Sequence, residues 1–181
     1  MQEVLAICKA HDYVQPTIFE GPYNLIDRAF ETALIPLLRT HGIRLAAHSP
    51  LAGGFLTGKL LSRSHSDSAP PQDTLSHFDP SWVLSSYYTK RYLPTAPALT
   101  ELQAFIAEHG LTLQEAAYRW LQHHSTMGPE DHGLVVGASS LEQLEGTIAD
   151  CEKGPLPDEV VEACERTWER VRHLAKDAWE P

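Results

Sequence analysis

Long apolar runs, a basic surface and paired cysteines are all missing from this 181-residue sequence. No stretch approaches the roughly 18 apolar residues of a membrane-spanning helix, so no membrane association is expected. Lysine and arginine number 14 against 24 aspartates and glutamates, and the resulting net charge of −10 argues against nucleic-acid binding. Cys8, Cys151 and Cys164 form no C-x-x-C pattern, so neither a disulfide framework nor a zinc knuckle is indicated. A reducing, cytoplasmic location is expected.

Several catalytic signatures are absent as well. The sequence has no H-E-x-x-H motif of zinc proteases and no G-x-S-x-G elbow of hydrolases. His123 and His124 are adjacent, so they point in different directions on a helix and do not suit one metal ion. The N-terminus lacks the basic start and small-residue cleavage site of a signal peptide. We therefore expect no metal site and no catalytic residue of these kinds.

The remaining pattern favours one α/β unit over residues 1–181. Short apolar stretches at 17–21, 43–49 and 133–139 are typical of strands, and they alternate with helical patterns, which favours parallel pairing. Three parallel strands are few for a chain of this length, because such strands normally have more neighbours, so we expect part of a larger sheet. Residues 62–80, rich in serine and proline, predict a mobile surface loop. The expected helices cover residues 2–11, 23–42, 82–93, 96–110, 112–125, 140–154 and 158–176.

The glycine-rich stretch SPLAGGFLTGKL, residues 49–60, follows the second predicted strand. Gly53, Gly58 and Lys59 fit the G-x-x-x-x-G-K start of a P-loop, but Leu60 stands where the magnesium-binding Ser or Thr belongs. No helical pattern follows, so nucleoside-triphosphate hydrolysis is disfavoured. A turn without a ligand and a phosphate-binding loop of another kind remain, since glycines let backbone N–H groups approach a phosphate closely.

A resemblance decides between these alternatives. The segments YNLIDRAFETALIPLLRTHGIRLAAHSPLAGGFLTGKL and GLVVGASSLEQLEGTI, in this order and spacing, resemble the aldo/keto reductase family, especially its aflatoxin-aldehyde-reductase-type subgroup. The resemblance implies an α/β fold that is the C-terminal part of a (β/α)₈ barrel, with about three parallel strands and an incomplete barrel. It further implies NADPH-dependent reduction of aldehydes or ketones, in some relatives within secondary-metabolite pathways.

The resemblance also implies two cofactor-binding segments. The loop after the second strand would wrap the pyrophosphate, and the helix opened by Ser139 and Ser140 would bind the 2′-phosphate through its N-terminal N–H groups. From the residues alone, Ser140 and Gln143 also form a capping box that needs no ligand. The implied cofactor-binding residues are Glu20, His48, Ser49, Pro50, Leu51, Ala52, Gly53, Gly54, Phe55, Leu56, Thr57, Gly58, Lys59, His77, Ser139, Ser140, Gln143 and Thr147.

Two residues of the aromatic segment SYYTKRY align with the substrate side of the family. Tyr88 and Arg91 are the implied substrate-binding residues, and Arg91 would suit a carboxylate-bearing aldehyde through bidentate contact. A solvated helix face is the alternative reading of the same segment. Glu20, His48, His77 and Thr147 all depart from the residues usual in the subgroup, which is expected to weaken cofactor contacts.

The largest departure concerns catalysis. The family's Asp–Tyr–Lys–His set comes from the first half of the barrel, and no position of this chain matches any of the four. The chain would hold barrel strands six to eight, which cannot close. We therefore expect either an aldo/keto reductase with this chain as its C-terminal part, or a catalytically inactive relative that binds NADP or a protein. The open sheet edges predict self-association or a partner chain.

Overall fold

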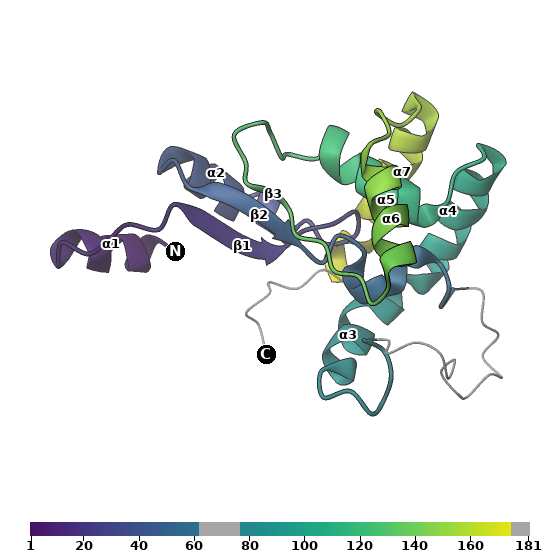
Figure 1. The fold of residues 1–181 in the computed structure, drawn as a ribbon, viewed down its shortest axis with the longest axis horizontal. Coiled ribbons are helices and arrows are strands. Elements are labelled where there is room, and N and C mark those ends of the chain that lie inside the picture. The colour runs from purple at the N-terminus through teal and green to yellow at the C-terminus, as the bar shows by residue number, and fades with distance from the viewer. Residues whose placement is uncertain (62–76, 175–181) are drawn as a thin grey trace.

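The computed structural model describes residues 1–61 and 77–174. Most of the loop predicted at 62–80 lies outside the described residues, and only its last part, residues 77–80, falls within them, in turns. Strands and helices alternate through the first half of the chain, and helices dominate the second half (Figure 1).

A three-stranded parallel sheet organises the fold, as the sequence predicted. The strands are β1 (Ile18–Pro22), β2 (Arg44–His48) and β3 (Gly133–Leu134), in the order β1-β2-β3. Phe19 pairs with Leu45, and Ala46 pairs with Gly133. All three strands therefore end at the same edge of the sheet, which is where segments following them meet.

β3 is much shorter than the strand predicted over 133–139. Val135 still donates its N–H to the carbonyl of Ala47, at 2.8 Å, but the ladder then ends. Val135 and Val136 are 40% and 37% exposed, so the described residues do not cover the apolar run that predicted a buried strand. Asp131 fixes the entry to β3, because it accepts hydrogen bonds from both Arg39 Nη atoms, at 2.6 Å, and from the Leu45 N–H, at 2.8 Å.

The helix predicted over 23–42 is wrong in its first half. Asn24 Oδ1 accepts from the N–H of Ile26, at 3.1 Å, and Asn24 and Asp27 form a short antiparallel bridge. This Asx-type turn competes with helix formation, as asparagine commonly does. A 3₁₀ turn, η1 (Ala29–Glu31), follows, and only α2 (Leu34–Thr40) is an α-helix.

Four helices pack beside the C-terminal end of the sheet: α3 (Ser85–Tyr92), α4 (Ala96–Glu108), α5 (Leu113–His123) and α7 (Asp158–Val171) (Figure 1). α5 begins as predicted, because Thr112 Oγ1 accepts from the N–H of Glu115, at 3.1 Å. Its Trp120 is 1% exposed and lies under the Arg28 guanidinium, 3.8 Å from the ring centroid. This cation–π contact joins the turn after β1 to the helices.

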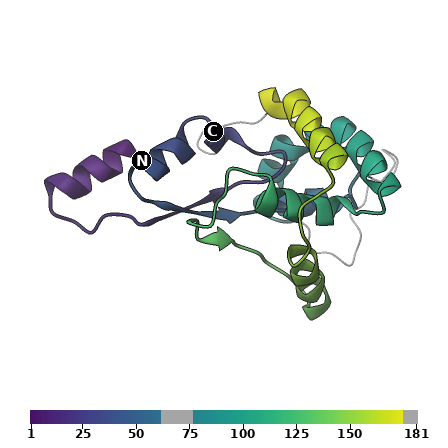
Figure 2. The ribbon, with the colours of Figure 1, turned by 90° about the horizontal axis from the view of Figure 1, so that it is seen from above.

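The opposite end of the sheet is sparsely covered. α1 (Gln2–Ala10) matches the helix predicted at 2–11, but none of its residues is buried, and Val4 and Ile7 are about half exposed, at 49% and 48%. Figure 1 shows α1 at the end of the molecule far from α3, α4, α5 and α7, and Figure 2 shows it from above, near α2. Within residues 1–61 and 77–174, no strand pairs with the outer edge of β1.

The same described ranges contain no helix long and apolar enough to cross a membrane.

Candidate cofactor and substrate site

The glycine-rich loop leaves β2 through an unusual backbone. Ser49 and Ala52 have φ of 55° and 51°, and Gly53 and Gly54 follow with φ of 68° and 95°. These left-handed conformations place the loop, with the irregular 3₁₀ turn η2 (Ala52–Thr57), across the end of the sheet. The Asn24 side-chain amide donates to the Ser49 carbonyl, at 3.0 Å, and so stabilises the beginning of the glycine-rich loop.

Part of the loop's hydrogen-bonding capacity is used internally. The N–H of Gly54 donates to the Leu51 carbonyl, at 2.9 Å, and that of Gly58 donates to the Phe55 carbonyl, at 3.2 Å. These two amides are engaged within the loop in this conformation, and binding of a pyrophosphate by the loop stays a prediction. The predicted loop residues divide by burial: Pro50, Ala52, Phe55, Leu56 and Gly58 are buried, Ser49, Leu51, Gly53, Gly54 and Thr57 are half-buried, and Lys59 is exposed.

The helix α6 (Leu141–Cys151) follows β3 and has the predicted cap. Ser140 Oγ accepts from the N–H of Gln143, at 3.2 Å. Gln143 Oε1 accepts from the N–H and the hydroxyl of Ser139, at 3.0 and 2.9 Å. All three residues are exposed, so the positive end of the α6 dipole faces solvent.

Thr147 differs in burial from the other predicted residues of α6. The structure buries it to 6% exposure, with its hydroxyl 3.4 Å from that of Tyr118 on α5. It points into the α5–α6 contact because it lies on the buried face of α6, and a role in cofactor binding stays a prediction. The other predicted residues at the N-terminus of α6, Ser139, Ser140 and Gln143, are exposed to solvent.

The two predicted cofactor segments emerge from the same edge of the sheet. The glycine-rich loop follows β2, α6 follows β3, and β2 and β3 are hydrogen-bonded parallel neighbours. α5 contacts both η2 and α6 and so links the two segments. The end of this sheet is the position at which parallel α/β sheets bind ligands.

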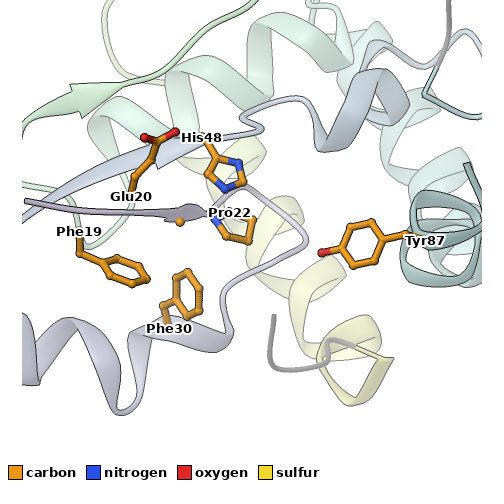
Figure 3. A pocket seen from close by; sticks show the side chains of 7 residues that line it. Phe19, Glu20, Pro22, Phe30, His48 and Tyr87 are labelled. Atoms are coloured by element: carbon orange, nitrogen blue, oxygen red, sulfur yellow. The ribbon is translucent and has the colours of Figure 1, made fainter. Parts of the chain in front are cut away.

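A hollow of about 190 Å³ lies at the end of β1 and β2 (Figure 3). Glu20 and His48, two of the implied cofactor-binding residues, both line it. Figure 3 shows Phe19 and Phe30 on one side of β1, Glu20 on the other, and the Tyr87 hydroxyl directed toward Pro22. The sheet therefore brings together two residues that are 28 positions apart in the sequence.

The His48 imidazole is half-buried and hydrogen-bonds through Nδ1 with the Ser49 hydroxyl, at 2.9 Å. Burial lowers its pKa from 6.5, and the negative charges of Glu20 and Asp27 oppose this only partly. The ring is therefore mostly neutral near pH 7. A neutral imidazole can pack against a flat aromatic ligand without adding positive charge to the hollow.

An aromatic cluster covers the glycine-rich loop. The Tyr88 ring contacts His77, Phe78 and Tyr92, with centroid separations of 4.8, 5.9 and 6.0 Å. It lies so close to Gly53 that a Cβ at this position would be 2.3 Å from the ring. Tyr88, an implied substrate-binding residue, and His77, an implied cofactor-binding residue, thus meet at the loop itself.

Arg91 has a partner that sequence reasoning missed. Its Nε and Nη2 donate to the two carboxylate oxygens of Asp27, at 2.8 and 2.9 Å. The Tyr92 hydroxyl donates to the same carboxylate, at 3.1 Å. The bidentate partner that we expected in a substrate is therefore Asp27. No local pattern signals this pair, because the two residues are 64 positions apart.

Metal chemistry has no visible basis in the described part of the chain, where no three His, Cys, Asp or Glu residues cluster as metal ligands would.

Comparison with known proteins supports the family resemblance. The model of the aldo/keto reductase family matches residues 1–169. An aldo-keto reductase of Pseudocercospora fijiensis is 38% identical over 173 residues, covering 94% of this chain and 56% of the relative. Human aflatoxin B1 aldehyde reductase member 2 is 38% identical over 176 residues, covering 94% and 48%. Oxidoreductase sirO of Leptosphaeria maculans is 35% identical over 176 residues, covering 97% and 52%.

The chain spans about half the length of these relatives. Its open three-stranded parallel sheet with flanking helices agrees with part of the barrel of that family, whose members act on small carbonyl compounds and generally use NAD(P)H. On the family match over residues 1–169 and the identity to these relatives, the chain belongs to the aldo/keto reductase family.

Proposed function

We propose that this chain forms the cofactor-binding part of an NADPH-dependent carbonyl reductase. One observation carries the proposal: the glycine-rich loop, with its positive φ values, and the capped N-terminus of α6 follow β2 and β3, which are neighbouring strands of one parallel sheet. A dinucleotide bound across these two ends would place its nicotinamide toward the hollow at Glu20 and His48. The adenosine half would then lie toward α6.

The N-terminus of α6 supports a preference for NADPH over NADH. The 2′-phosphate is a dianion, and the exposed helix N-terminus at Ser139, Ser140 and Gln143 offers N–H groups, hydroxyls and a positive dipole end. Lys59 is exposed at the end of the glycine-rich loop and adds a positive charge beside the pyrophosphate. These contacts compensate locally for a chain whose net charge is −10.

Bound NADPH would supply a hydride to the carbonyl carbon of the substrate. The chain's own contribution is to hold the nicotinamide: His48 would pack against the ring, and Glu20 would accept a hydrogen bond from the carboxamide. None of residues 1–181 matches the proton-donating tyrosine or its Asp, Lys and His partners. Turnover therefore depends on a further polypeptide segment.

The outer edge of β1 is where such a segment would add. Its backbone groups have no strand partner in the described residues, and barrels of this kind close by strand pairing. A second chain, or a second copy, would bind there. The alternative function, an inactive relative that binds NADP or a protein, is favoured by the same two observations: the missing tetrad and the open edge.

A titration tests the proposed function. Fluorescence from the four tryptophans is followed as NADPH, NADH and ATP are added, and reduction of 4-nitrobenzaldehyde is then assayed. We expect NADPH to bind more tightly than NADH and ATP. Binding without turnover by the chain alone would agree with the dependence on a further segment, whereas turnover would contradict it. No binding of NADPH would refute the proposed function and leave only the relative that binds a protein, and binding of ATP alone would revive the P-loop hypothesis.

A cytoplasmic location and a role in a secondary-metabolite pathway stay predictions. The cysteine pattern supports the first, and the family resemblance, which includes fungal relatives, supports the second.

A further inference from the structure

Arg91 is the basic residue that the sequence assigned to substrate recognition, and in the structure its charge is already matched. Its guanidinium and the Asp27 carboxylate meet in a bidentate ion pair, at 2.8 and 2.9 Å. Both side chains are buried, with 8% and 4% of their surface exposed. A parallel fork of two charge-assisted hydrogen bonds is the strongest arrangement these groups can form.

The surroundings of the pair make it unfavourable for a substrate carboxylate to take the place of Asp27 beside Arg91. The Tyr92 hydroxyl donates to Asp27 Oδ2, at 3.1 Å, and Tyr92 is 2% exposed. A substrate carboxylate that took over Arg91 would leave the charge of Asp27 buried without its counterion, which is strongly unfavourable. The ion pair raises the pKa of Arg91 further above its usual range despite burial, so its charge is not lost either.

Tyr87 connects this ion pair to the hollow. The Arg91 guanidinium lies 5.7 Å from the centroid of the Tyr87 ring, and Tyr87 also lines the hollow at the end of β1. In Figure 3 its side chain stands opposite Pro22 and His48. The part of α3 that lines the hollow is therefore the Tyr87 ring, and the Arg91 guanidinium lies behind this ring.

The lining of the hollow carries no positive charge at neutral pH. Phe19, Pro22, Phe30 and Tyr87 present mainly apolar surface. Glu20 is exposed and adds a carboxylate, whereas burial keeps His48 largely neutral. An anion entering the hollow would meet one like charge and no counterion, whereas a neutral compound with an apolar body would meet compatible surface.

We propose that Asp27 is a specificity-determining residue: by neutralising Arg91 it makes this site select uncharged aldehydes and ketones over carboxylate-bearing ones. The proposal rests on the proposed function, because it names the substrate class of that same site. Asp27 acts through Arg91 and does not itself touch the substrate.

The test compares two ligands that differ in one charge. Succinic semialdehyde is an anion at pH 7, and its methyl ester, methyl 4-oxobutanoate, has the same aldehyde without the carboxylate. Binding of each to the full chain saturated with NADPH, whose dihydronicotinamide ring is uncharged, is measured by saturation-transfer NMR titration. We expect the ester to bind at least tenfold more tightly than the semialdehyde. Equal binding, or tighter binding of the semialdehyde, would overturn the proposal.

Two variants identify the residue responsible. Asp27→Asn keeps the shape of the side chain but frees the charge of Arg91, so semialdehyde affinity should rise at least tenfold while ester affinity changes less than threefold. Asp27→Asn combined with Arg91→Gln should abolish that gain. An unchanged ratio of the two affinities in Asp27→Asn would refute the role of Asp27. If Asp27→Asn does not fold, the wild-type comparison of the two ligands still decides the selectivity.

Failure of this inference is distinguishable from failure of the proposed function. NADPH binding is followed in the same samples through tryptophan fluorescence. Absence of cofactor binding would refute the proposed function. Cofactor binding with no binding of either aldehyde would overturn only the inference, because the hollow would then not be a carbonyl site.

Discussion

Replacing Gly53 by alanine would show whether Tyr88 truly rests on the glycine-rich loop. Gly53 has φ +68°, and a Cβ built there lies 2.3 Å from Cδ1 and Cε1 of the Tyr88 ring. Gly54 has φ +95°, but nothing lies within 4 Å of its Cβ position. Gly54→Ala is therefore a matched control that introduces backbone strain without the steric clash.

The magnitudes follow from these two effects. A left-handed backbone costs a residue with a Cβ about 1–2 kcal/mol, and overpacking costs typically about 1–3 kcal/mol more. We expect Gly54→Ala to lower the free energy of unfolding by about 1–2 kcal/mol and Gly53→Ala by about 2–5 kcal/mol. Tyr88 cannot move aside freely, because its ring also contacts His77 and Phe78.

Urea unfolding, followed by circular dichroism, measures both variants in wild-type and Tyr88→Ala backgrounds. In the Tyr88→Ala background the cost of Gly53→Ala should fall to about 1–2 kcal/mol, because only backbone strain remains, while the cost of Gly54→Ala should not change. Equal costs for the two glycines in both backgrounds would refute the close packing of Tyr88 on this loop.

Three further changes test other parts of the account. Ser140→Ala should lower the free energy of unfolding by about 1 kcal/mol and weaken NADPH more than NADH in fluorescence titrations, because α6 loses its cap; an unchanged cofactor preference would argue against a 2′-phosphate site there. Lys59→Gln should weaken NADPH binding severalfold in low salt and much less in high salt, and a loss independent of salt would contradict an electrostatic role. Asp131→Asn should lower the free energy of unfolding by about 2–4 kcal/mol at pH 7, because it breaks a largely buried pair with Arg39. Burial alone would raise the pKa of Asp131, but Arg39 and two backbone N–H donors hold it below 3.8, so this stabilisation exists above the unfolded pKa and is lost as the pH falls through the folded value. Urea unfolding between pH 7 and about 3 should show the difference from wild type narrowing, and a constant difference would contradict the assignment.

The sequence predicted the parts of the fold that local patterns determine. The strand ending at His48 and the glycine-rich turn after it were predictable because an apolar run gives way to residues that tolerate positive φ. The starts of α5 and α6 were predictable because Thr112 and Ser140 are capping residues three positions before a Glu or Gln.

Elements that depend on competing or distant interactions were not predictable in this way. Apolar spacing suggested a helix from residue 23, but the side chain of Asn24 stabilises a turn instead. Three residues of the candidate site differ from expectation for tertiary reasons. Thr147 is buried against Tyr118, and Arg91 is held by Asp27. Tyr118 and Asp27 are both distant in sequence from the residues they contact, so only the packing of α3 and α6 reveals these contacts. The position of Tyr88 over the glycine-rich loop is likewise a tertiary contact.

The central claim is that the glycine-rich loop after β2 and the N-terminus of α6 bind one dinucleotide. Titration of ¹⁵N-labelled chain with NADP⁺, followed by amide chemical shifts, tests it most directly. We predict that amides in residues 53–59 and 139–143 shift together along a single saturation curve, and that NAD⁺ shifts the second group less. Shifts confined to one segment, or two curves with different midpoints, would contradict the claim.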